Sequence, residues 1–372
     1  MITRIAIMRS LPGLGDLLCA VPAWRSLKAA LPKAQVTLIG LPWAQTFVKR
    51  FSKYLDNFLE FPGYPGIPEV TPPLQKLPGF FASVQQQCFD LALQMHGSGI
   101  VSNPFTVLLG ARLNAGFYLP SQYCPDAERF LPYPEHEPEV WRHLRLMEFL
   151  GIPLQGTELE FPLWEEDFSA LHQIQEAREL KAGEYVCVHP GASVHHRRWS
   201  VEKFVAVADA IAARGFQVIL TGTAAEADLT QCLGRLMQAR PIDLAGRTSL
   251  GMIAALLSSA RLLVCNDTGI SHLAAALRVK SVVIFSASDP NRWAPLDRDR
   301  HRVVREMSQR RAGVSPPPLI PTAWGPRVPQ RGPQSPPVEA TGVGRLHSLP
   351  ITPDAVMSEV DDLLSQEVTG VS

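Results

Sequence analysis

A carboxylate stands in a glycine-containing turn near the start of the chain. The segment "RIAIMRSLPGLGDLLCAVPAWRSL" places Asp16 between a short apolar run and a pattern typical of a helix. The positive end of a helix stabilises an ionised carboxylate. Ligands of open α/β sheets bind beyond the carboxyl ends of the strands. Asp16 is therefore a candidate general base, and helix N-capping is the structural alternative.

The same turn lacks two common nucleotide fingerprints. Gly13 and Gly15 supply G-x-G, but Leu18 stands where the third glycine of a dinucleotide site would fall. No G-K-[ST] follows, so the P-loop is also excluded. An NAD-dependent oxidoreductase is accordingly disfavoured.

A second candidate site is "VHPGASVHHRRW" at residues 188–199, which follows an apolar run. A small-residue turn around Ser193, with the guanidinium groups of Arg197 and Arg198 nearby, suits a diphosphate. His195 and His196 invite a zinc interpretation, but no cysteine or carboxylate lies at ligand spacing, so no metal is predicted. A solvated basic loop is the structural alternative.

A third candidate site is "LLVCNDTGISHLAAAL" at residues 262–277, where a strand pattern passes through a turn into a helix pattern. The free N–H groups at the start of that helix, with the Thr268 hydroxyl and the bare Gly269, would admit a phosphate. Helix capping by Asp267 is the alternative, which leaves His272 unexplained. Glu226, in "LTGTAAEADL", could accept hydrogen bonds from ribose hydroxyls, or it is a surface helix residue. No G-x-S-x-G is present, so serine-hydrolase chemistry is unsupported.

Strand and helix patterns alternate along the chain, which predicts an α/β fold with two doubly wound parallel sheets. In the first half, residues 4–8, 35–40 and 89–97 read as strands and 22–31 as a helix, with proline-rich loops at 62–78 and 120–138. The second half repeats the alternation of strand and helix patterns from residue 184 to residue 286. The predicted domains span 1–165 and 180–305, with one connecting helix over 165–180.

The chain changes character near its end. Residues 306–350 are dominated by Pro, Gly, Arg and Ser, a composition that predicts a segment of low order. Two explanations stay open: a natural divergent insertion, or a disturbance of the reading frame. After it, "TPDAVMSEVDDLLSQ" predicts a final helix within 351–368, with a threonine cap and a proline in its first turn.

Composition bounds the function classes. The 372 residues are 46% hydrophobic and 19% charged, and the 35 basic residues balance the 35 acidic ones, which argues against a general nucleic-acid binder. The six cysteines are scattered singly in apolar segments, so we expect reduced core residues in a cytoplasmic protein. No apolar run is long enough for a membrane span or a signal peptide.

Taken in order, these segments resemble a known family. "RSLPGLGDLLCAVPAWRSLKAALPKAQVTLI", "HPGAS…RRWS", "TGTAAEAD" and "LAGRTSLGMIAALLSSARLLVCNDTGISHLAAAL" are similar to glycosyltransferase family 9, the ADP-heptose:lipopolysaccharide heptosyltransferases. The resemblance covers residues 1 to about 297 and resumes weakly in the final helix. It implies a GT-B architecture, in which two Rossmann-like domains face each other across a cleft. The C-terminal domain would bind the donor and the N-terminal domain the acceptor.

The resemblance also implies residue roles. Asp16 would be the general base of a metal-independent, inverting transfer that needs no cofactor. Thr268 and Gly269 would meet the donor diphosphate, Glu226 its ribose, and Asp267 and His272 complete the motif. A lysine of the family falls on Arg197, a departure that changes the shape of the cation. The donor set we expect is Ser193, Arg197, Arg198, Glu226, Asp267, Thr268, Gly269 and His272, and the acceptor-side set is Arg9, Gly15 and His96.

The expected partners are a nucleotide-sugar donor and a lipid-linked saccharide acceptor. We expect a monomer that contacts the cytoplasmic face of the inner membrane peripherally. A nucleotide-sugar epimerase of the same fold and a non-catalytic sugar-nucleotide or lipid-saccharide binding protein remain as alternatives.

Overall fold

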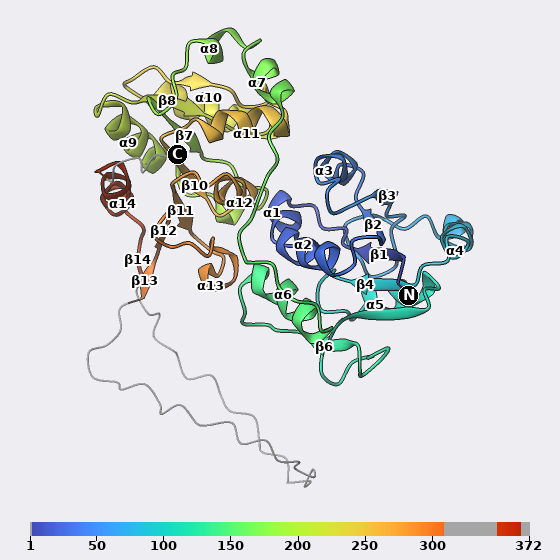
Figure 1. Ribbon diagram of the computed structural model, residues 1–372. Coiled ribbons are helices and arrows are strands. Elements are labelled where there is room, and N and C mark those ends of the chain that lie inside the picture. The colour runs from blue at the N-terminus through green and yellow to red at the C-terminus, as the bar shows by residue number, and fades with distance from the viewer. Residues whose placement is uncertain (1, 309–347, 366–372) are drawn as a thin grey trace, which may run out of the picture.

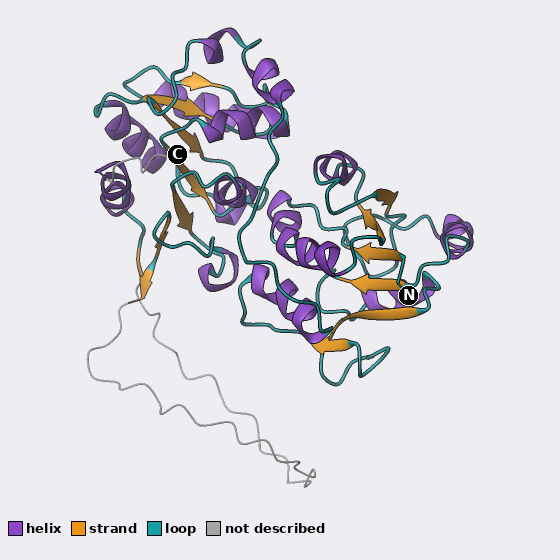
Figure 2. Ribbon diagram, viewed as in Figure 1, coloured by secondary structure: helices purple, strands orange, loops and turns teal. Residues whose placement is uncertain are grey.

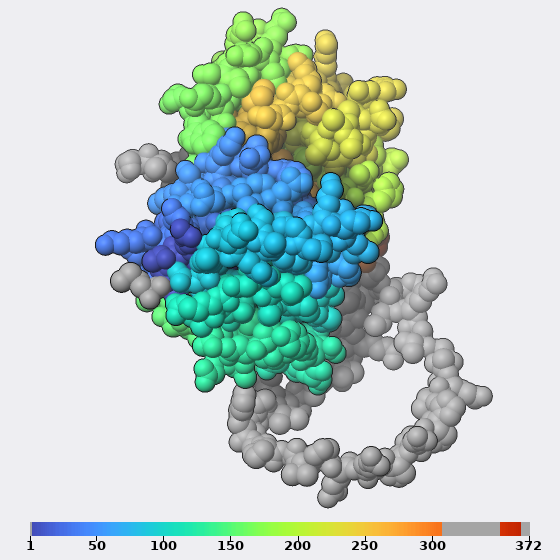
Figure 3. Space-filling view, turned by 90° about the vertical axis from the view of Figure 1, so that its right-hand side faces the viewer, coloured from blue at the N-terminus to red at the C-terminus, as the bar shows by residue number. Residues whose placement is uncertain are grey.

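The computed structural model describes residues 2–308 and 348–365 of the chain. Within this part it contains two α/β units, each with a six-stranded parallel sheet flanked by helices (Figures 1 and 2). The α/β prediction with two doubly wound sheets is therefore confirmed. In the space-filling view, the N-terminal residues (blue to teal) and the C-terminal residues (green to orange) form two masses that meet along a boundary (Figure 3).

The first sheet has the strand order β3-β2-β1-β4-β5-β6. Its strands are β1 (Arg4–Met8), β2 (Gln35–Gly40), β3 (Asn57–Glu60), β4 (Leu91–Gln94), β5 (Leu113–Tyr118) and β6 (Phe130–Pro132). Its helices are α1 (Leu14–Leu18), α2 (Val21–Ala30), α3 (Ala44–Arg50), η1 (Leu74–Lys76), α4 (Leu77–Gln85), α5 (Ser102–Leu108) and α6 (Glu139–Phe149). The central strands are mainly apolar, with Ile5–Met8 in β1 and Leu91–Leu93 in β4, because helices cover both faces of a parallel sheet.

The second sheet has the order β12-β11-β10-β7-β8-β9. Taken from its other edge, this is the same topology as that of the first sheet. Its strands are β7 (Tyr185–His189), β8 (Gln217–Leu220), β9 (Ile242–Asp243), β10 (Leu262–Asn266), β11 (Ser281–Phe285) and β12 (His301–Arg305). Its helical segments are η2 (His195–Arg197), α9 (Val201–Ala212), η3 (Ala224–Glu226), α10 (Ala227–Leu236), α11 (Leu250–Ser258), α12 (Gly269–Ala276) and α13 (Pro290–Trp293).

Some predicted elements were wrong. The single helix expected over 165–180 is two short helices, α7 (Glu165–Leu171) and α8 (Gln175–Arg178). Asp167 in α7 forms a bidentate pair with Arg50 of α3 at 2.6 and 2.8 Å, and α7 packs on α11. These contacts anchor the start of α7, whereas the break lies at residues 172–174, where Ile174 is extended as the N-cap of α8. The two proline-rich loops also contain structure, since α4 begins at Leu77 and β6 lies within 120–138.

The cysteine prediction was right for only part of the set. All six cysteines are free, and Cys19, Cys187 and Cys265 are buried. Cys88 and Cys232 are exposed and Cys124 is half-buried. Cys88 lies in a turn with a φ of 50°, and Cys232 lies on α10, whose buried face is carried by Thr230 and Leu233. A cysteine inside an apolar segment can thus still face solvent.

Residues 309–347 of the segment 306–350 lie outside the described residues, so the low order predicted for the segment stays a prediction. Its two ends, however, pair as an antiparallel ladder between β13 (Met307–Ser308) and β14 (Ser348–Leu349). These two short strands were not predicted from the sequence, because backbone pairing needs no apolar period.

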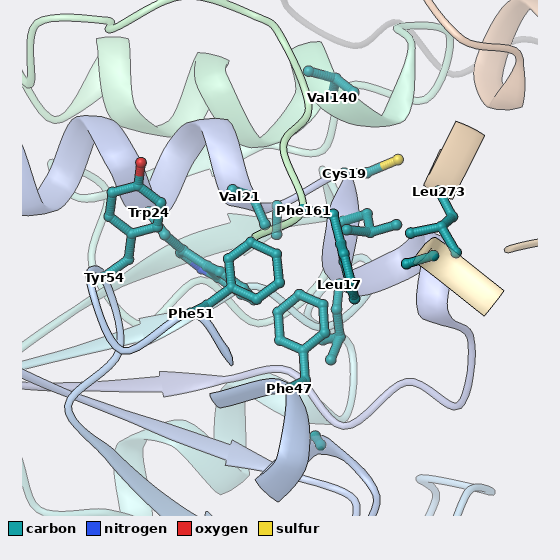
Figure 4. Packing of buried hydrophobic residues seen from close by; sticks show 14 of the residues in the cluster. Leu17, Cys19, Val21, Trp24, Phe47, Phe51, Tyr54, Val140, Phe161 and Leu273 are labelled. Carbon is teal, nitrogen blue, oxygen red and sulfur yellow. The ribbon is translucent and has the colours of Figure 1, made fainter. Parts of the chain in front are cut away.

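A cluster of aromatic side chains packs in the core of the first domain. Phe47 stacks on Phe51 with ring centroids 4.2 Å apart, and Trp24 and Phe161 meet this pair edge-on (Figure 4). Phe161 belongs to the segment that leads out of the first domain, so the exit of the chain is anchored to this core.

The final helix, α14 (Pro353–Ser365), docks on the second domain. Thr352 caps it, since the Ala355 N–H donates to Oγ1 at 3.2 Å, and the predicted cap is confirmed. Its buried residues are Val356, Met357, Val360 and Leu363, and it packs on α9 and the neighbouring strands.

Leu363→Ala should lower the free energy of unfolding by about 2–5 kcal/mol, because it leaves a cavity at a fully buried site. Urea denaturation of the full chain measures this. The matched control is Leu236→Ala, at a side chain that is 53% exposed and should change stability little. Equal effects of the two substitutions would mean that α14 does not dock.

Candidate functional site

The two sheets direct their ligand-binding ends at each other. In each sheet the strand order reverses between two central strands, β1 and β4 in the first and β7 and β10 in the second. Crevices outside the carboxyl ends of such strands are where doubly wound sheets bind ligands. Arg9 and His96 follow β1 and β4, while Ser193 and Asp267 follow β7 and β10. The predicted sites therefore fall at these two reversals.

Helices α1 and α12 join the reversals across the domain boundary (Figure 1). Their contact is close because two glycines form it. A Cβ on Gly15 would lie 2.5 Å from Cδ2 of His272, and a Cβ on Gly269 would lie 3.1 Å from Cβ of Leu14. No larger residue fits either position without a shift, so the contact brings the Asp16 turn to the start of α12.

Asp16 is the third residue of α1, and Gly13 occupies the N-cap position. The Gly13 N–H donates to the Asp16 carboxylate, which reaches back over the turn. A Cβ on Gly13 would lie 2.4 Å from Oδ2 of Asp16. The capping alternative is thus corrected in detail: Asp16 supports the cap from the third position, which is a common place for an acidic side chain.

Arg9 holds the Asp16 turn by its backbone. Its Nε and Nη2 donate to the carbonyl oxygen of Asp16 at 2.9 and 2.6 Å, and Nη1 donates to the carbonyl oxygen of Met95 at 2.5 Å. The side chain is buried. Arg9 therefore ties the turn after β1 to the end of β4, a structural task beyond the acceptor-side role predicted for it.

Sequence reasoning missed Glu139, the first residue of α6. Four side chains surround its buried carboxylate: Arg9 at 3.4 Å, His143 at 3.3 Å, Arg292 at 3.1 Å, and Arg142, which forms a short ion pair. We call these five residues the Glu139 cluster. Arg292 comes from α13 in the second domain, so the cluster spans both domains. The sequence signal is weak, because an acidic residue after a proline is ordinary at a helix start.

Opposing electrostatic effects act on the pKa of Asp16. Burial raises its pKa above the usual value, the charge of Arg9 lowers it, and the charge of Glu139 raises it again. A weaker lowering comes from Arg292. A raised pKa is what a carboxylate general base needs to accept a proton near neutral pH.

His96 lies beside the same turn as a neutral imidazole. Burial, and to a lesser degree the charge of Arg9, lower its pKa to about 4. The Ser10 N–H donates to Nδ1 at 3.3 Å, which places the ring proton on Nε2. Nε2 lies 3.8 Å from Oε2 of Glu69, a residue of the first proline-rich loop.

On the donor side, Thr268 is the N-cap of α12, and its hydroxyl makes no capping hydrogen bond. The capping role weighed for Asp267 was therefore wrong. Asp267 instead pairs with Arg197 at 3.6 Å and accepts a short hydrogen bond from Ser288. Arg197 is thereby held beside the first N–H groups of α12, where an anion would be attracted.

The turn after β7 is held by two polar side chains. Arg198 donates from Nε to the carbonyl oxygen of Ala192 at 2.9 Å, so it shapes the turn that exposes Ser193. Asn266 was missed: its Oδ1 accepts from the Trp199 N–H at 3.0 Å and its Nδ2 donates to the Pro190 carbonyl at 2.7 Å. The sequence "ND" at the end of a strand does not predict that its asparagine amide binds both ends of the segment between β7 and α9.

Glu226 is buried, which overturns the surface-residue alternative. Its Oε2 accepts from the backbone N–H and the hydroxyl of Thr223 at 2.8 and 2.9 Å. A Cβ on Gly191 would lie 2.1 Å from Oε1, so the glycine lets the turn after β7 approach this carboxylate.

His272 faces the first domain. Its Nδ1 lies 3.5 Å from Sγ of Cys19, and its ring meets that of Trp293 edge-on. Its predicted donor role stays a prediction, and the structure adds a contact between domains. Among residues 2–308 and 348–365, no group of three or more His, Cys, Asp or Glu side chains could hold a metal ion. In that same part of the chain, no helix is both long and apolar enough to cross a membrane.

Comparison with known proteins decides the family. The profile of glycosyltransferase family 9 (heptosyltransferase) matches residues 79–314. The chain belongs to glycosyltransferase family 9. This confirms the family resemblance, and the matched range contains the motif at Asp267 to His272 but begins after the Asp16 turn.

Relatives within family 9 share both sequence and fold with the chain. Lipopolysaccharide heptosyltransferase 3 of Escherichia coli (strain K12) is 31% identical over 159 residues, which are 42% of this chain and 46% of that protein. The chain thus spans about half the length of this curated relative.

Two solved structures carry the fold comparison. One is a family 9 glycosyl transferase from Veillonella parvula, with a TM-score of 0.74, 18% identity and 97% of each chain covered. The other is E. coli ADP-heptose lps heptosyltransferase II, with a TM-score of 0.69, 20% identity, and 97% of this chain and 98% of that chain covered. The GT-B architecture implied by the resemblance is confirmed.

Proposed function

We propose that this chain transfers heptose from ADP-heptose to a lipopolysaccharide-type, lipid-linked saccharide, with inversion and without a metal. The observation that carries the proposal is the meeting of the Asp16 turn with the start of α12 at the Gly15–His272 contact. The names of the relatives, which include an ADP-heptose enzyme, support the donor and the acceptor class.

The chemistry follows from the placement of the side chains. Asp16 accepts the proton of an acceptor hydroxyl while that oxygen attacks the anomeric carbon of the donor sugar. The bond between this carbon and the diphosphate oxygen breaks, and ADP leaves with the electron pair. The first N–H groups of α12, the Thr268 hydroxyl and Arg197 stabilise the negative charge on the diphosphate. Glu226 accepts hydrogen bonds from the ribose hydroxyls.

The acceptor binds on the side of Arg9, Gly15 and His96. His96 offers a neutral ring beside the turn, a group that can hydrogen-bond a sugar hydroxyl without competing for its proton. The enzyme would act as a monomer at the cytoplasmic face of the inner membrane, bound peripherally to reach a lipid-linked substrate.

A donor panel tests the proposal. ADP-linked, GDP-linked, UDP-linked and dTDP-linked sugars are compared by thermal shift, and the sugar that stabilises the chain is then incubated with a lipopolysaccharide acceptor. A ligand at 100 times its Kd stabilises the folded state by about 2.7 kcal/mol. We expect stabilisation by ADP-linked sugars and release of ADP only when acceptor is present.

Two other results contradict the transferase. Conversion of the sugar nucleotide without acceptor would indicate an epimerase, and binding without release of ADP would indicate a binding protein. Stabilisation by none of the four nucleotides would remove the donor assignment altogether.

A further inference from the structure

The Glu139 cluster is the place where a charged side chain of the second domain enters the first. Arg292 approaches Oε2 of Glu139 with Nη2 at 3.1 Å and Nε at 3.2 Å, and its Nη2 also lies 3.4 Å from the Tyr133 hydroxyl. Glu139 is 4% exposed. The carboxylate is the buried partner of this ion pair, so removal of Arg292 leaves a buried negative charge less well compensated.

Glu139 connects this contact to the Asp16 turn through one further side chain. Its Oε1 lies 3.4 Å from Nη2 of Arg9, the same nitrogen that donates to the Asp16 carbonyl oxygen at 2.6 Å. The path from the second domain to the turn is therefore Arg292, Glu139, Arg9 and the Asp16 backbone. Every member contacts the next one directly.

The junction also has room to change. Glu139, Arg292, Cys19 and His272 line a cavity of about 470 Å³ between the domains. Arg292 is about one-third exposed, whereas Arg9 and Arg142 are buried. Arg292 is thus the member of the cluster that can leave when the domains separate, while the two arginines of the first domain stay.

We propose that Arg292 and Glu139 form a latch that fixes the Asp16 turn in its working position when the second domain docks. This rests on the proposed role of Asp16 as the general base. Glu139 and Arg292 are positioning residues in this scheme, because they act on Asp16 through Arg9 and through charge.

Charge gives the latch a second effect on Asp16. Its carboxylate is influenced by Arg9 from the end of β1, Glu139 from α6 and Arg292 from α13. Cys19 and His272, the other titratable groups at the α1–α12 contact, are uncharged near neutral pH, because burial raises the thiol pKa and lowers the imidazole pKa. Docking of Arg292 adds a positive charge, which lowers the pKa of Asp16 and favours its ionised form. When Arg292 moves away, the negative charge of Glu139 is less well neutralised, which raises the pKa of Asp16 and favours its protonated form.

Two substitutions should therefore move Asp16 in opposite directions. Arg292→Met keeps much of the side-chain length but removes the charge, so the acid limb of kcat against pH should shift to higher pH, with kcat reduced about tenfold at neutral pH. Arg292→Lys restores the charge and should recover part of the loss. Glu139→Gln removes a negative charge that raises the pKa of Asp16, so the acid limb should shift to lower pH. It also weakens the contact with Arg9, which should lower the maximum kcat.

The matched control is Arg235→Met, which removes an exposed cation from α10, where its Nη2 lies 3.5 Å from Oε1 of Gln231 on the same helix. It should leave kcat and the acid limb unchanged. The KM for the donor should stay within about twofold in all variants, since none of the substituted residues belongs to the donor set.

A measurement without substrate separates the latch from the proposed function. The chain is labelled with ¹³C at the aspartate carboxyl carbons, and the Asp16 resonance is assigned by its loss in Asp16→Asn. We expect its titration midpoint to rise in Arg292→Met, to return toward the wild-type midpoint in Arg292→Lys, and to fall in Glu139→Gln. Equal midpoints in all three variants, or shifts in one common direction, overturn the latch.

The two assays fail in different ways. If the midpoints shift as expected but the wild-type chain transfers no sugar, the charge coupling stands and the transferase assignment fails. If the wild-type chain is active and both kcat and the midpoint are unchanged in Arg292→Met, the transferase stands and the latch fails. A loss of stability alone, with an unchanged acid limb, would mean that the pair is merely structural.

Discussion

Asp16→Asn should lower kcat by about 100-fold or more while leaving the affinity for ADP nearly unchanged. Asparagine has the same shape and can still accept the Gly13 N–H, so the turn is kept. Asparagine cannot take up the proton of the attacking saccharide hydroxyl, and loss of a general base lowers the rate by about 10²–10⁴-fold. The Arg9 fork should survive too, because it grips the backbone carbonyl of residue 16. Single-turnover transfer and calorimetric titration with ADP measure the two quantities.

Asp299→Asn is the control for this substitution. Asp299 is fully exposed, and its nearest cation is Arg302 at 3.9 Å. The control should transfer sugar at the wild-type rate. Near-wild-type turnover in Asp16→Asn would remove the general-base role, and a parallel loss of ADP affinity would show that the substitution disturbs the donor site instead.

Gly15→Ala should lower kcat/KM by about 10-fold to 100-fold, because the new methyl group has no room at the contact between domains. Its Cβ would lie 2.5 Å from Cδ2 of His272. Overpacking at such a contact costs about 1–3 kcal/mol, and a displacement of about 1 Å at a catalytic group can cost 100-fold in rate. We expect α1 and α12 to be pushed apart, with an increased radius of gyration in solution scattering.

Gly79→Ala is the matched control, since a Cβ there meets nothing within 4 Å and the residue lies within α4. It should keep full activity and gain about 0.5–1 kcal/mol in helix stability. Removing the opposing ring should relieve the clash, so His272→Ala in the Gly15→Ala background should lose less than the two single substitutions added together. Strict additivity would mean that the ring is not the obstacle.

The parallel sheets could be predicted because a strand covered on both faces must be apolar along its length. The runs at residues 4–8 and 35–40 were placed correctly for that reason. The Asp16 turn was also predictable, since a strand, a glycine turn and an acidic residue follow one another in the sequence. What failed was the continuity of the helix expected over 165–180: the chain leaves the helical conformation at residues 172–174 and is extended at Ile174, a break that the helical pattern does not show.

The donor set stays a prediction, and the side chains that hold its members in place were not predicted. Nothing near Glu139 in the sequence announces that Arg9 and Arg292, 130 and 153 positions away, meet there. Asn266 was missed for the same reason, because its bonds go to Trp199 and Pro190. Local pattern predicts which side chains are candidates for chemistry, whereas the side chains that hold them are found only when the fold brings distant segments together.

Arg9 holds the Asp16 turn by a main-chain oxygen, so this contact does not depend on the side chain at position 16. If Asp16 is the general base, as proposed, an Asp16→Asn enzyme should keep the contact between α1 and α12 and still bind donor and acceptor. Such a variant is suited to trapping donor and acceptor together, unreacted, for crystallography or cryo-electron microscopy. It would also allow an unidentified saccharide to be captured from bacterial extracts, because the captured molecule would not be converted.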